Sequence, residues 1–273
     1  MRAARFALGD LVGLMGMGLL IGGGACAAGP KAGDGGGGPG AGLDCSENLP
    51  LGSDTISDFE SGSGVVLPWD GRRGGWYAYN DRSATCVEDP APGAPDPASA
   101  PLETPRCGST AAFRARGMGC STWGAGVGAD LAAPAPVDGA AGSGSAPTRK
   151  ITYDLSGFRA ISFWGRVGAG ATGAVRFKLP MLADTKIVDG GLCQLSEIGT
   201  DKCSDDWGRP LIFSTAWKLF TVPLVDDSGT GLSTEGWGKQ FPLDLTNVVA
   251  IQFQVAANTT FDVWIDDVNL TRK

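Results

Sequence analysis

Short runs of alternating apolar and polar residues recur along this chain, and they constrain its fold more than any other feature. In the sequence VRFKLP, for example, Val175 and Phe177 alternate with Arg176 and Lys178. This period of two is that of a β-strand with one face in a core and the other in solvent. Because antiparallel sheets leave one face polar, the pattern predicts strands of that kind.

The runs are separated by Gly, Pro and Ser, and no long stretch that follows the N-terminal region has a helical period. They cover residues 55–60, 74–81, 111–117, 123–133, 159–167, 173–182, 217–225, 247–257 and 261–270. Many short strands at such spacing are typical of a β-sandwich or barrel. With 273 residues, of which 42% are hydrophobic, the chain can bury one good core. We therefore predict an all-β fold, a single antiparallel β-sandwich domain.

The first residues have the features of an export signal. Arg2 and Arg5 precede the apolar stretch 11–25, and small residues surround Cys26. The junction GGAC resembles the bacterial lipoprotein signal, in which the cysteine becomes the lipidated first residue, although Gly23 stands where leucine is usual. Ordinary signal-peptidase cleavage after Ala27 remains an alternative. An uncleaved membrane span is a further one, because about fifteen apolar residues approach the ~20 that a span needs.

We expect three parts in the chain. Residues 1–26 form a lipoprotein-type signal peptide that ends in the lipidation cysteine Cys26, residues 27–50 form a flexible Gly- and Pro-rich tether, and residues 51–273 form the sandwich. The tether favours a lipid anchor in the cell envelope over secretion. Within the domain, the Pro-rich segment 87–106 is expected to be an insertion that does not pack by itself.

Cysteine occurs seven times, and an exported protein meets an oxidising environment, so the cysteines beyond the signal are expected to form disulfides. Cys193 and Cys203 bracket a short polar loop, and we predict that they are joined. No CxxC motif is present, which gives little support to a thiol-redox or zinc-ribbon function.

The pairing of the other four cysteines is less constrained. Cys86 and Cys107 bracket the Pro-rich segment, whose closure at its base would stabilise it. That pairing leaves Cys45 with Cys120. Free thiols and the other pairings of these four remain open.

Several function classes are excluded or weakened by composition. The chain contains no histidine, which excludes Ser-His-Asp and Cys-His catalysis and His-ligated zinc. A carboxylate pair of the glycosidase type remains possible, but the E-x-D-x-x-E pattern of jelly-roll glucanases is absent, as is a phosphate-binding P-loop. The formal net charge is −7 and the basic residues form no run, so nucleic acid is not an expected partner.

A family resemblance rests on motifs that follow one another in order between residues 51 and 271. The motifs are ISDFESGSG, GGWYAYND, WGAGVGADL, YDLSGFRAISFWGRV, CSDDWG, WKLFTVPL and FDVWIDDVNL. This order resembles the jelly-roll carbohydrate-binding modules of the galactose-binding-domain-like class, particularly family 11 modules and related bacterial surface lipoproteins. Segment 87–106 and the cysteine-bounded loop depart from the pattern. The resemblance implies a jelly-roll sandwich with a glycan-binding role.

The same resemblance implies a structural calcium ion, which in such modules joins the first strand to the last. Acids stand at both places here: Asp58 and Glu60 near the start, and Asp266 and Asp267 near the end. Ca²⁺ takes six to eight oxygen ligands, so carboxylates suit it. Because adjacent strand residues point to opposite faces, we expect only one of Asp266 and Asp267 to contribute its side chain. Plain solvated acids are the alternative.

A second acid pair, Asp205 and Asp206, lies beside Trp207. These acids can rim a binding face or hold a cation, and they can equally belong to an ordinary solvated loop that Cys203 fixes.

Sugar binding needs an aromatic face for the C–H side of the ring and planar polar groups for the hydroxyls. Polar strand faces and one edge of the sheet offer both. The candidate ligand-binding residues are Trp76, Tyr79, Arg176, Lys178, Gln252 and Gln254.

These observations predict an exported, lipid-anchored monomer that binds a polysaccharide without catalysis and touches the membrane only through its anchor. A surface structural or protein-interaction module of the same fold is the main alternative. A glycosidase with an unfamiliar carboxylate pair is a weaker one.

Overall fold

The computed structural model describes residues 51–94, 97–132, 135–136, 148–194, 202–224 and 231–273. They belong to one compact unit, Gly42–Lys273. None of the helices in these described ranges has the length and hydropathy of a membrane span. The predicted signal peptide, lipidation site Cys26 and tether lie outside the described residues.

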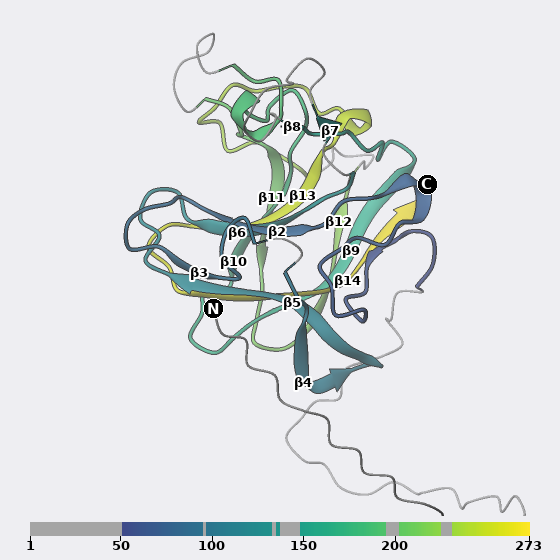
Figure 1. The fold of residues 1–273 in the computed structure, drawn as a ribbon, viewed down its shortest axis with the longest axis vertical. Helices are drawn as coiled ribbons and strands as arrows, with labels where there is room; N and C mark the ends of the chain where they lie inside the picture. The colour runs from purple at the N-terminus through teal and green to yellow at the C-terminus, as the bar shows by residue number, and fades with distance from the viewer. Residues whose placement is uncertain (1–50, 95–96, 133–134, 137–147, 195–201, 225–230) are drawn as a thin grey trace, which may run out of the picture. The chain divides into compact units, whose positions relative to one another are not determined.

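Two antiparallel sheets form the two layers of the fold (Figure 1). The first has the strand order β12-β9-β14-β5-β3, with β1 paired to β14 and β4 to β5. Its strands are β1 (Thr55–Ser57), β3 (Val87–Asp89), β4 (Ala100–Arg106), β5 (Ser109–Met118), β9 (Phe158–Val167), β12 (Lys218–Pro223) and β14 (Phe261–Arg272).

The second sheet has the order β11-β10-β13-β6-β2. Its strands are β2 (Trp76–Asn80), β6 (Ala125–Asp130), β10 (Ala174–Leu179), β11 (Trp207–Ile212) and β13 (Ala250–Val255). A separate pair consists of β7 (Ala135–Pro136) and β8 (Thr148–Arg149). Short 3-10 helices are η2 (Trp69–Gly71), η3 (Ile187–Asp189) and η4 (Leu245–Asn247).

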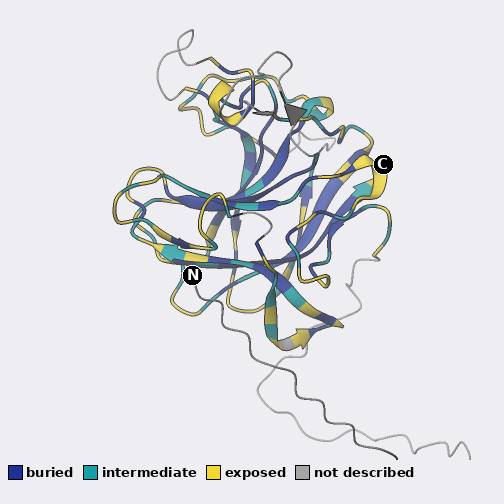
Figure 2. Ribbon diagram, in the orientation of Figure 1, coloured by how far each residue is buried: buried dark blue, intermediate teal, exposed yellow. Residues whose placement is uncertain are grey.

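The core lies between the two sheets, and buried residues occur along the central strands of both (Figure 2). The rings of Phe163 on β9 and Phe253 on β13 meet edge to face with centroids 4.8 Å apart, and Phe177 on β10 lies 5.6 Å from Phe253. Phe163 and Phe253 come from opposite sheets, so their contact joins the layers, whereas Phe177 and Phe253 are paired within the second sheet. The predicted antiparallel β-sandwich is confirmed.

Segment 87–106, which was predicted to be an insertion that does not pack by itself, contains β3 and β4. Both pair with β5, one at each end: Val87 lies opposite Met118, and Arg106 opposite Ser109. Edge strands tolerate proline, since an outward N–H is not needed for pairing. The composition of the segment therefore did not reveal that it pairs with a long strand elsewhere in the chain.

The pairing of β3 with β5 explains one of the disulfides. Cys86 and Cys120 flank the antiparallel strands β3 and β5 at the same end, and they are joined with their Cα atoms 4.1 Å apart. The predicted Cys86–Cys107 and Cys45–Cys120 pairs are therefore wrong. Cys107 is disulfide-bonded as well and lies in the turn between β4 and β5, while Cys45 lies outside the described residues.

Cys193 and Cys203 are joined, with an S–S distance of 2.17 Å and Cα atoms 5.9 Å apart. The short loop between them predicted this bond. It fixes the segment that leads into β11, which carries Asp205 and Asp206.

Candidate functional site

The side of the second sheet that points away from the core carries two rows of residues in register. We call these two rows the polar face. One row is Tyr79, Gly126, Gln254 and Arg176, and the other is Tyr77, Gly128, Gln252 and Lys178, each on β2, β6, β13 and β10 in turn. Residues between the rows, such as Phe177 and Phe253, point into the core. The rows span about 14 Å, three strand spacings of about 4.8 Å.

The hydroxyl ends of two tyrosine rings lie close over the neighbouring strand, which has glycine at both positions. A Cβ added to Gly128 would lie 2.8 Å from Cζ and from the hydroxyl of Tyr77. At Gly126 the corresponding distances to Tyr79 are 2.7 Å. The ring centroids are 6.0 Å apart with their planes at 48°. Both tyrosines are half-buried.

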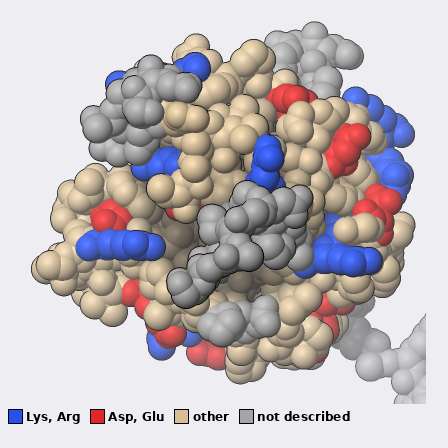
Figure 3. Space-filling model, turned by 45° about the horizontal axis from the view of Figure 1, so that its top comes forward, with Lys and Arg blue, Asp and Glu red and all other residues tan. Residues whose placement is uncertain are grey.

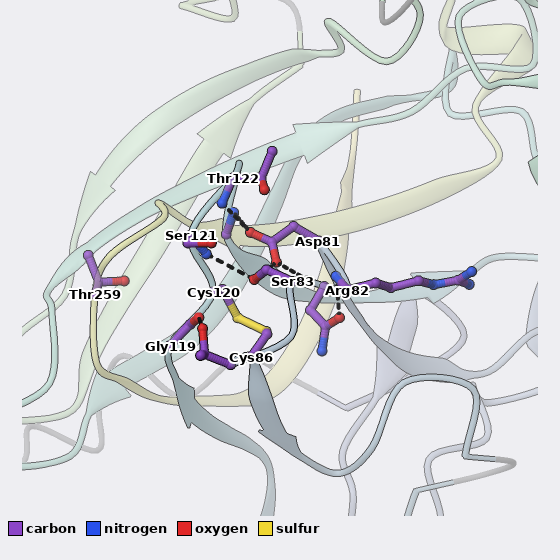
Figure 4. Close-up of a disulfide and its surroundings, with 12 residues drawn as sticks. Asp81, Arg82, Ser83, Cys86, Gly119, Cys120, Ser121, Thr122 and Thr259 are labelled. Atoms are coloured by element: carbon purple, nitrogen blue, oxygen red, sulfur yellow. Dashed lines mark hydrogen bonds between the residues drawn. A yellow bond between two sulfur atoms is a disulfide. The ribbon is translucent and has the colours of Figure 1, made fainter.

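Trp123 extends this aromatic surface. Its ring lies 5.9 Å from that of Tyr79 with the planes at 28°, and the residue is 43% exposed. The carboxylate of Asp81 holds the loop in place by accepting from the N–H groups of Thr122, Trp123 and Gly124 at 2.7, 3.1 and 3.1 Å (Figure 4). Desolvation alone would raise the pKa of Asp81, but the hydrogen bonds from Ser83 and this loop hold it well below its ordinary value.

The Cys86–Cys120 disulfide lies beside Asp81 (Figure 4). Among the described residues, Asp81, Cys86 and Cys120 are the one group spaced closely enough to suggest a metal site. Both sulfurs are bonded to each other and the carboxylate accepts from the loop, so these residues have a structural role. They anchor the loop that carries Trp123.

The two glutamines of β13 are oriented by hydrogen bonds. Nε2 of Gln252 donates to the Tyr77 hydroxyl at 2.9 Å, and Nε2 of Gln254 donates to the Trp123 carbonyl at 3.2 Å. Burial raises the pKa of both phenols well above the ordinary value. The charge of Asp130 adds to this effect at Tyr77, and the neighbouring Tyr77 adds to it at Tyr79. Both hydroxyls therefore stay neutral at physiological pH.

Each of the two cations on the polar face has an acidic neighbour. Nζ of Lys178 lies 2.6 Å from Asp206 and donates to Gln254 at 3.1 Å. The guanidinium of Arg176 donates to the Ser233 carbonyl at 2.5 Å, and its Nε lies 4.0 Å from Glu235. Charge along this part of the sheet is balanced locally.

The same holds at the edge near β2, where Lys150 pairs with Asp130 and places Nζ 4.9 Å from the centroid of the Tyr77 ring. On the side of the molecule shown in Figure 3, basic and acidic side chains are interspersed. The described residues of the polar face thus offer aromatic and amide groups beside paired charges.

Asp205 and Asp206 are both buried, at 3% exposure, and belong to the structural support of this face. Asp205 accepts from the N–H groups of Glu235, Gly236 and Gly238 at 2.8, 2.8 and 3.0 Å. The reading of this pair as an ordinary solvated loop is therefore wrong. Asp205 fixes the neighbouring loop, and Asp206 fixes Lys178.

Asp184 lies next to this group and accepts from the Met181 N–H at 2.8 Å. Burial, together with the charge of Asp206, raises the pKa of Asp184 to about 8.

The structure brings Tyr79, Arg176, Lys178, Gln252 and Gln254 together on one face, but not Trp76. Trp76 is 2% exposed. In the core, its ring stacks on Phe113 at 5.1 Å and on Phe253 at 6.2 Å, and its Nε1 donates to the Ser57 hydroxyl at 2.9 Å. The prediction that Trp76 flanks the site is wrong, because its neighbours in the strand take the outward positions.

Sequence reasoning missed four contributors to the site: Tyr77, Trp123, Gly126 and Gly128. A signal for the glycines was present in GAGVGAD, where they recur with period two on the outward side of a strand. Their use by the tyrosines depends on the pairing of β2 with β6, which local sequence does not specify.

The four acids predicted to hold calcium do come near one another, around an arginine. One guanidinium nitrogen of Arg106 lies 2.7 Å from Asp266 and 2.5 Å from Asp267. The two side chains do not point to opposite faces as the strand pattern predicted: Asp267 has a φ of 45°, and the strand register shifts there, so both carboxylates reach the same atom. Burial and the nearby Asp267 charge raise the pKa of Asp266 to about 7, against the opposing effect of Arg106.

Glu60 is engaged in the same region. Its carboxylate accepts from the N–H groups of Thr110 and Ala111 at 2.8 and 3.1 Å and from the Ser109 hydroxyl at 3.0 Å. Asp58 accepts from the Glu60 N–H at 3.3 Å. As arranged, these oxygens do not form a cage for a divalent ion, because protein donors and a guanidinium already occupy them. Calcium remains a prediction from the sequence resemblance.

No family model and no curated protein sequence matches this chain. Solved structures that resemble it include the family 11 carbohydrate-binding module from Clostridium thermocellum in complex with a β-1,3-1,4-mixed-linked tetrasaccharide. That similarity has 16% identity and a TM-score of 0.43 and covers 80% of this chain and 95% of the other. The family 30 module from the same organism has 11% identity and a TM-score of 0.43, over 81% and 97%. An exo-β-agarase has 9% identity and a TM-score of 0.45, over 81% and 25%.

Proposed function

We propose that this domain binds a polysaccharide without catalysis, through the polar face of the second sheet. The observation that carries the proposal is the pair of tyrosine rings, Tyr77 and Tyr79, whose hydroxyl ends lie over Gly128 and Gly126 beside two oriented glutamines. A flat aromatic face suits the C–H side of a sugar ring, and amide groups suit its hydroxyls. The rows extend about 14 Å, which fits an oligosaccharide segment better than one sugar.

The paired charges of the polar face support a non-catalytic role. Asp206 is paired with Lys178, and Asp130 with Lys150, so neither acid is placed as a general acid opposite a nucleophile. An open, shallow site of this kind gives weak binding, on the order of 1 mM to 1 μM, or roughly −4 to −8 kcal/mol.

A glycan array followed by isothermal titration against soluble β-glucans, xylans and galactans tests the proposal. We expect at least one binder, and we expect Tyr79→Ala to weaken it at least about ten-fold while the protein remains folded. If the folded domain binds no glycan on the array, the protein-interaction module becomes the better interpretation. Release of reducing sugar by the wild type would instead favour the glycosidase alternative.

The cellular setting belongs to the same proposal: an exported protein that Cys26 anchors to a membrane through lipid. Many anchored copies would raise the effective affinity for a repeating polymer. Metabolic labelling with a fatty-acid analogue is expected to mark the wild type and not Cys26→Ser. Label that persists in the variant would contradict the anchor.

A further inference from the structure

We infer that Arg106 is the built-in cation at the junction of β1, β4, β5 and β14, and that its guanidinium takes the place of the divalent ion that the acids there predict. The domain then needs no metal to join its first and last strands. This inference concerns the support of the sandwich and is independent of the proposed function.

The guanidinium is fully enclosed. Arg106 is 0% exposed, and so is the side chain of Asp266, while the side chain of Asp267 is 10% exposed. The planes of two indoles cover the cation: Cζ lies 4.6 Å from the Trp164 ring and 5.5 Å from the Trp217 ring. A buried cation is retained only where charge and hydrogen bonding compensate for lost water, and this site supplies both.

The hairpin of β4 and β5 positions the Arg106 guanidinium next to Asp266 and Asp267. Arg106 is the last residue of β4 and lies opposite Ser109, the first of β5, across a tight turn whose Cys107 is disulfide-bonded. The Ser109 Oγ lies within hydrogen-bond distance of both Asp266, at 2.7 Å, and Glu60, at 3.0 Å. The β4–β5 hairpin and the acids Asp266 and Glu60 therefore form one hydrogen-bonded unit.

The first and last strands of the described domain meet through the same unit. β14 pairs with β1 immediately after the two acids, where Val268 lies opposite Ser57 and Asn269 opposite Thr55. The Thr55 hydroxyl donates to the Asn269 side chain at 2.6 Å. Fixing Asp266 and Asp267 therefore also fixes the pairing of the first strand with the last.

A divalent ion does not fit beside the arginine. Ca²⁺ needs six to eight oxygens at about 2.3–2.6 Å, and the guanidinium nitrogen already lies at 2.7 and 2.5 Å from the two carboxylates. An ion at the same oxygens would also face the positive charge of Arg106 across a buried, weakly screened space. The carboxylates can serve one cation or the other.

The experiment measures metal content and melting of the folded domain. Wild-type protein, purified and exposed to Ca²⁺, is expected to contain no stoichiometric divalent metal by elemental analysis, and its melting temperature is expected to change by less than about 1 °C with chelator or with added Ca²⁺. A bound ion whose free concentration is a hundred times its Kd would raise the melting temperature by about 5–10 °C. One equivalent of Ca²⁺ whose removal lowers the melting temperature by that amount would overturn the inference.

A variant tests the exchange directly. Arg106→Ala removes the internal cation and leaves the two acids facing each other, so we expect a lower melting temperature that added Ca²⁺ partly restores. The triple variant Arg106→Ala, Asp266→Asn, Asp267→Asn is expected to lose that response, and Arg272→Ala, which removes an exposed arginine paired with Asp54, is expected to show none. Should Arg106→Ala not fold, the wild-type measurements decide the inference alone.

Discussion

The ring of Tyr77 lies across Gly128 so closely that a single added carbon on the glycine would stand 2.8 Å from the tyrosine hydroxyl. Such a distance is below that of ordinary non-bonded contacts, so the orientation of the ring requires glycine at this position. Because the same residue pairs by backbone with Gln252, the glycine sets the arrangement of aromatic and amide groups on the polar face.

Replacing that glycine is therefore expected to change binding through the tyrosine. In Gly128→Ala the Tyr77 ring must tilt away from the sheet, and we expect glycan affinity to fall at least about ten-fold, or about 1.4 kcal/mol, with a stability loss of about 1–3 kcal/mol. Titration calorimetry and denaturant unfolding measure the two effects. Gly157→Ala is the matched control, since an added Cβ there meets nothing within 4 Å, and equal affinities for both variants would count against the role of Tyr77.

Removing the exposed indole next to Tyr79 is expected to weaken binding without unfolding the domain. Trp123→Ala loses an aromatic surface that is 43% exposed, and we expect about a five- to ten-fold loss of affinity, roughly 1 kcal/mol. Trp69→Ala removes an indole of similar exposure, 41%, in η2, and we expect unchanged affinity. A comparable loss in both variants would show that the effect is general rather than local.

Trp76 is expected to behave as a core residue. Trp76→Ala removes a ring that stacks between Phe113 and Phe253, and the free energy of unfolding is expected to fall by about 3–5 kcal/mol. Titrated at a temperature where the variant is folded, it is expected to keep wild-type glycan affinity. An exposed, ligand-contacting tryptophan would show the reverse: little change in the unfolding curve and lost binding.

The disulfide between Cys86 and Cys120 closes a loop with a sequence separation of 34. In the chain-entropy model, a loop of that size contributes about 4 kcal/mol, and the shorter Cys193–Cys203 loop about 3 kcal/mol. We expect the Cys86→Ser, Cys120→Ser double variant to unfold at lower denaturant concentration than the Cys193→Ser, Cys203→Ser variant. Chemical denaturation under non-reducing conditions measures the difference, and the opposite ranking would contradict the simple loop-length argument.

Glu88 on β3 is expected to make stability depend on pH. Burial raises its pKa to about 8, whereas the unfolded chain has the ordinary value of 4.5. The folded state therefore retains the proton more strongly: this contribution is fully present below pH 4.5 and is lost as the pH rises through about 8. At about 1.36 kcal/mol per pKa unit, it amounts to a few kcal/mol.

Unfolding free energies measured from pH 5 to pH 9 test this. Glu88→Gln imitates the protonated acid, and we expect the variant to lose less stability than the wild type over that range. Glu103→Gln, at an exposed position of β4, is the control and is expected to follow the wild type. Parallel curves for wild type and Glu88→Gln would remove Glu88 as the source.

The family resemblance and the alternation of apolar and polar residues predicted most of the fold. Val175, Phe177 and Leu179 alternate with Arg176 and Lys178, and the structure buries the first three in the core while the last two lie on the polar face. The same reasoning grouped Gln252 and Gln254 on that face. It failed for Asp266 and Asp267, because a bulge interrupts the alternation between them.

Sequence by itself thus determined which residues of each strand share a side, because side-chain direction in a strand repeats every two residues and needs no distant partner. Only the tertiary structure decided which strands pair, and hence that Tyr77 covers Gly128, that Cys86 meets Cys120 and that Arg106 reaches Asp266. These contacts join residues far apart in the chain. Their geometry follows from sheet register and packing, which are properties of the whole fold and are not encoded in any local run of residues.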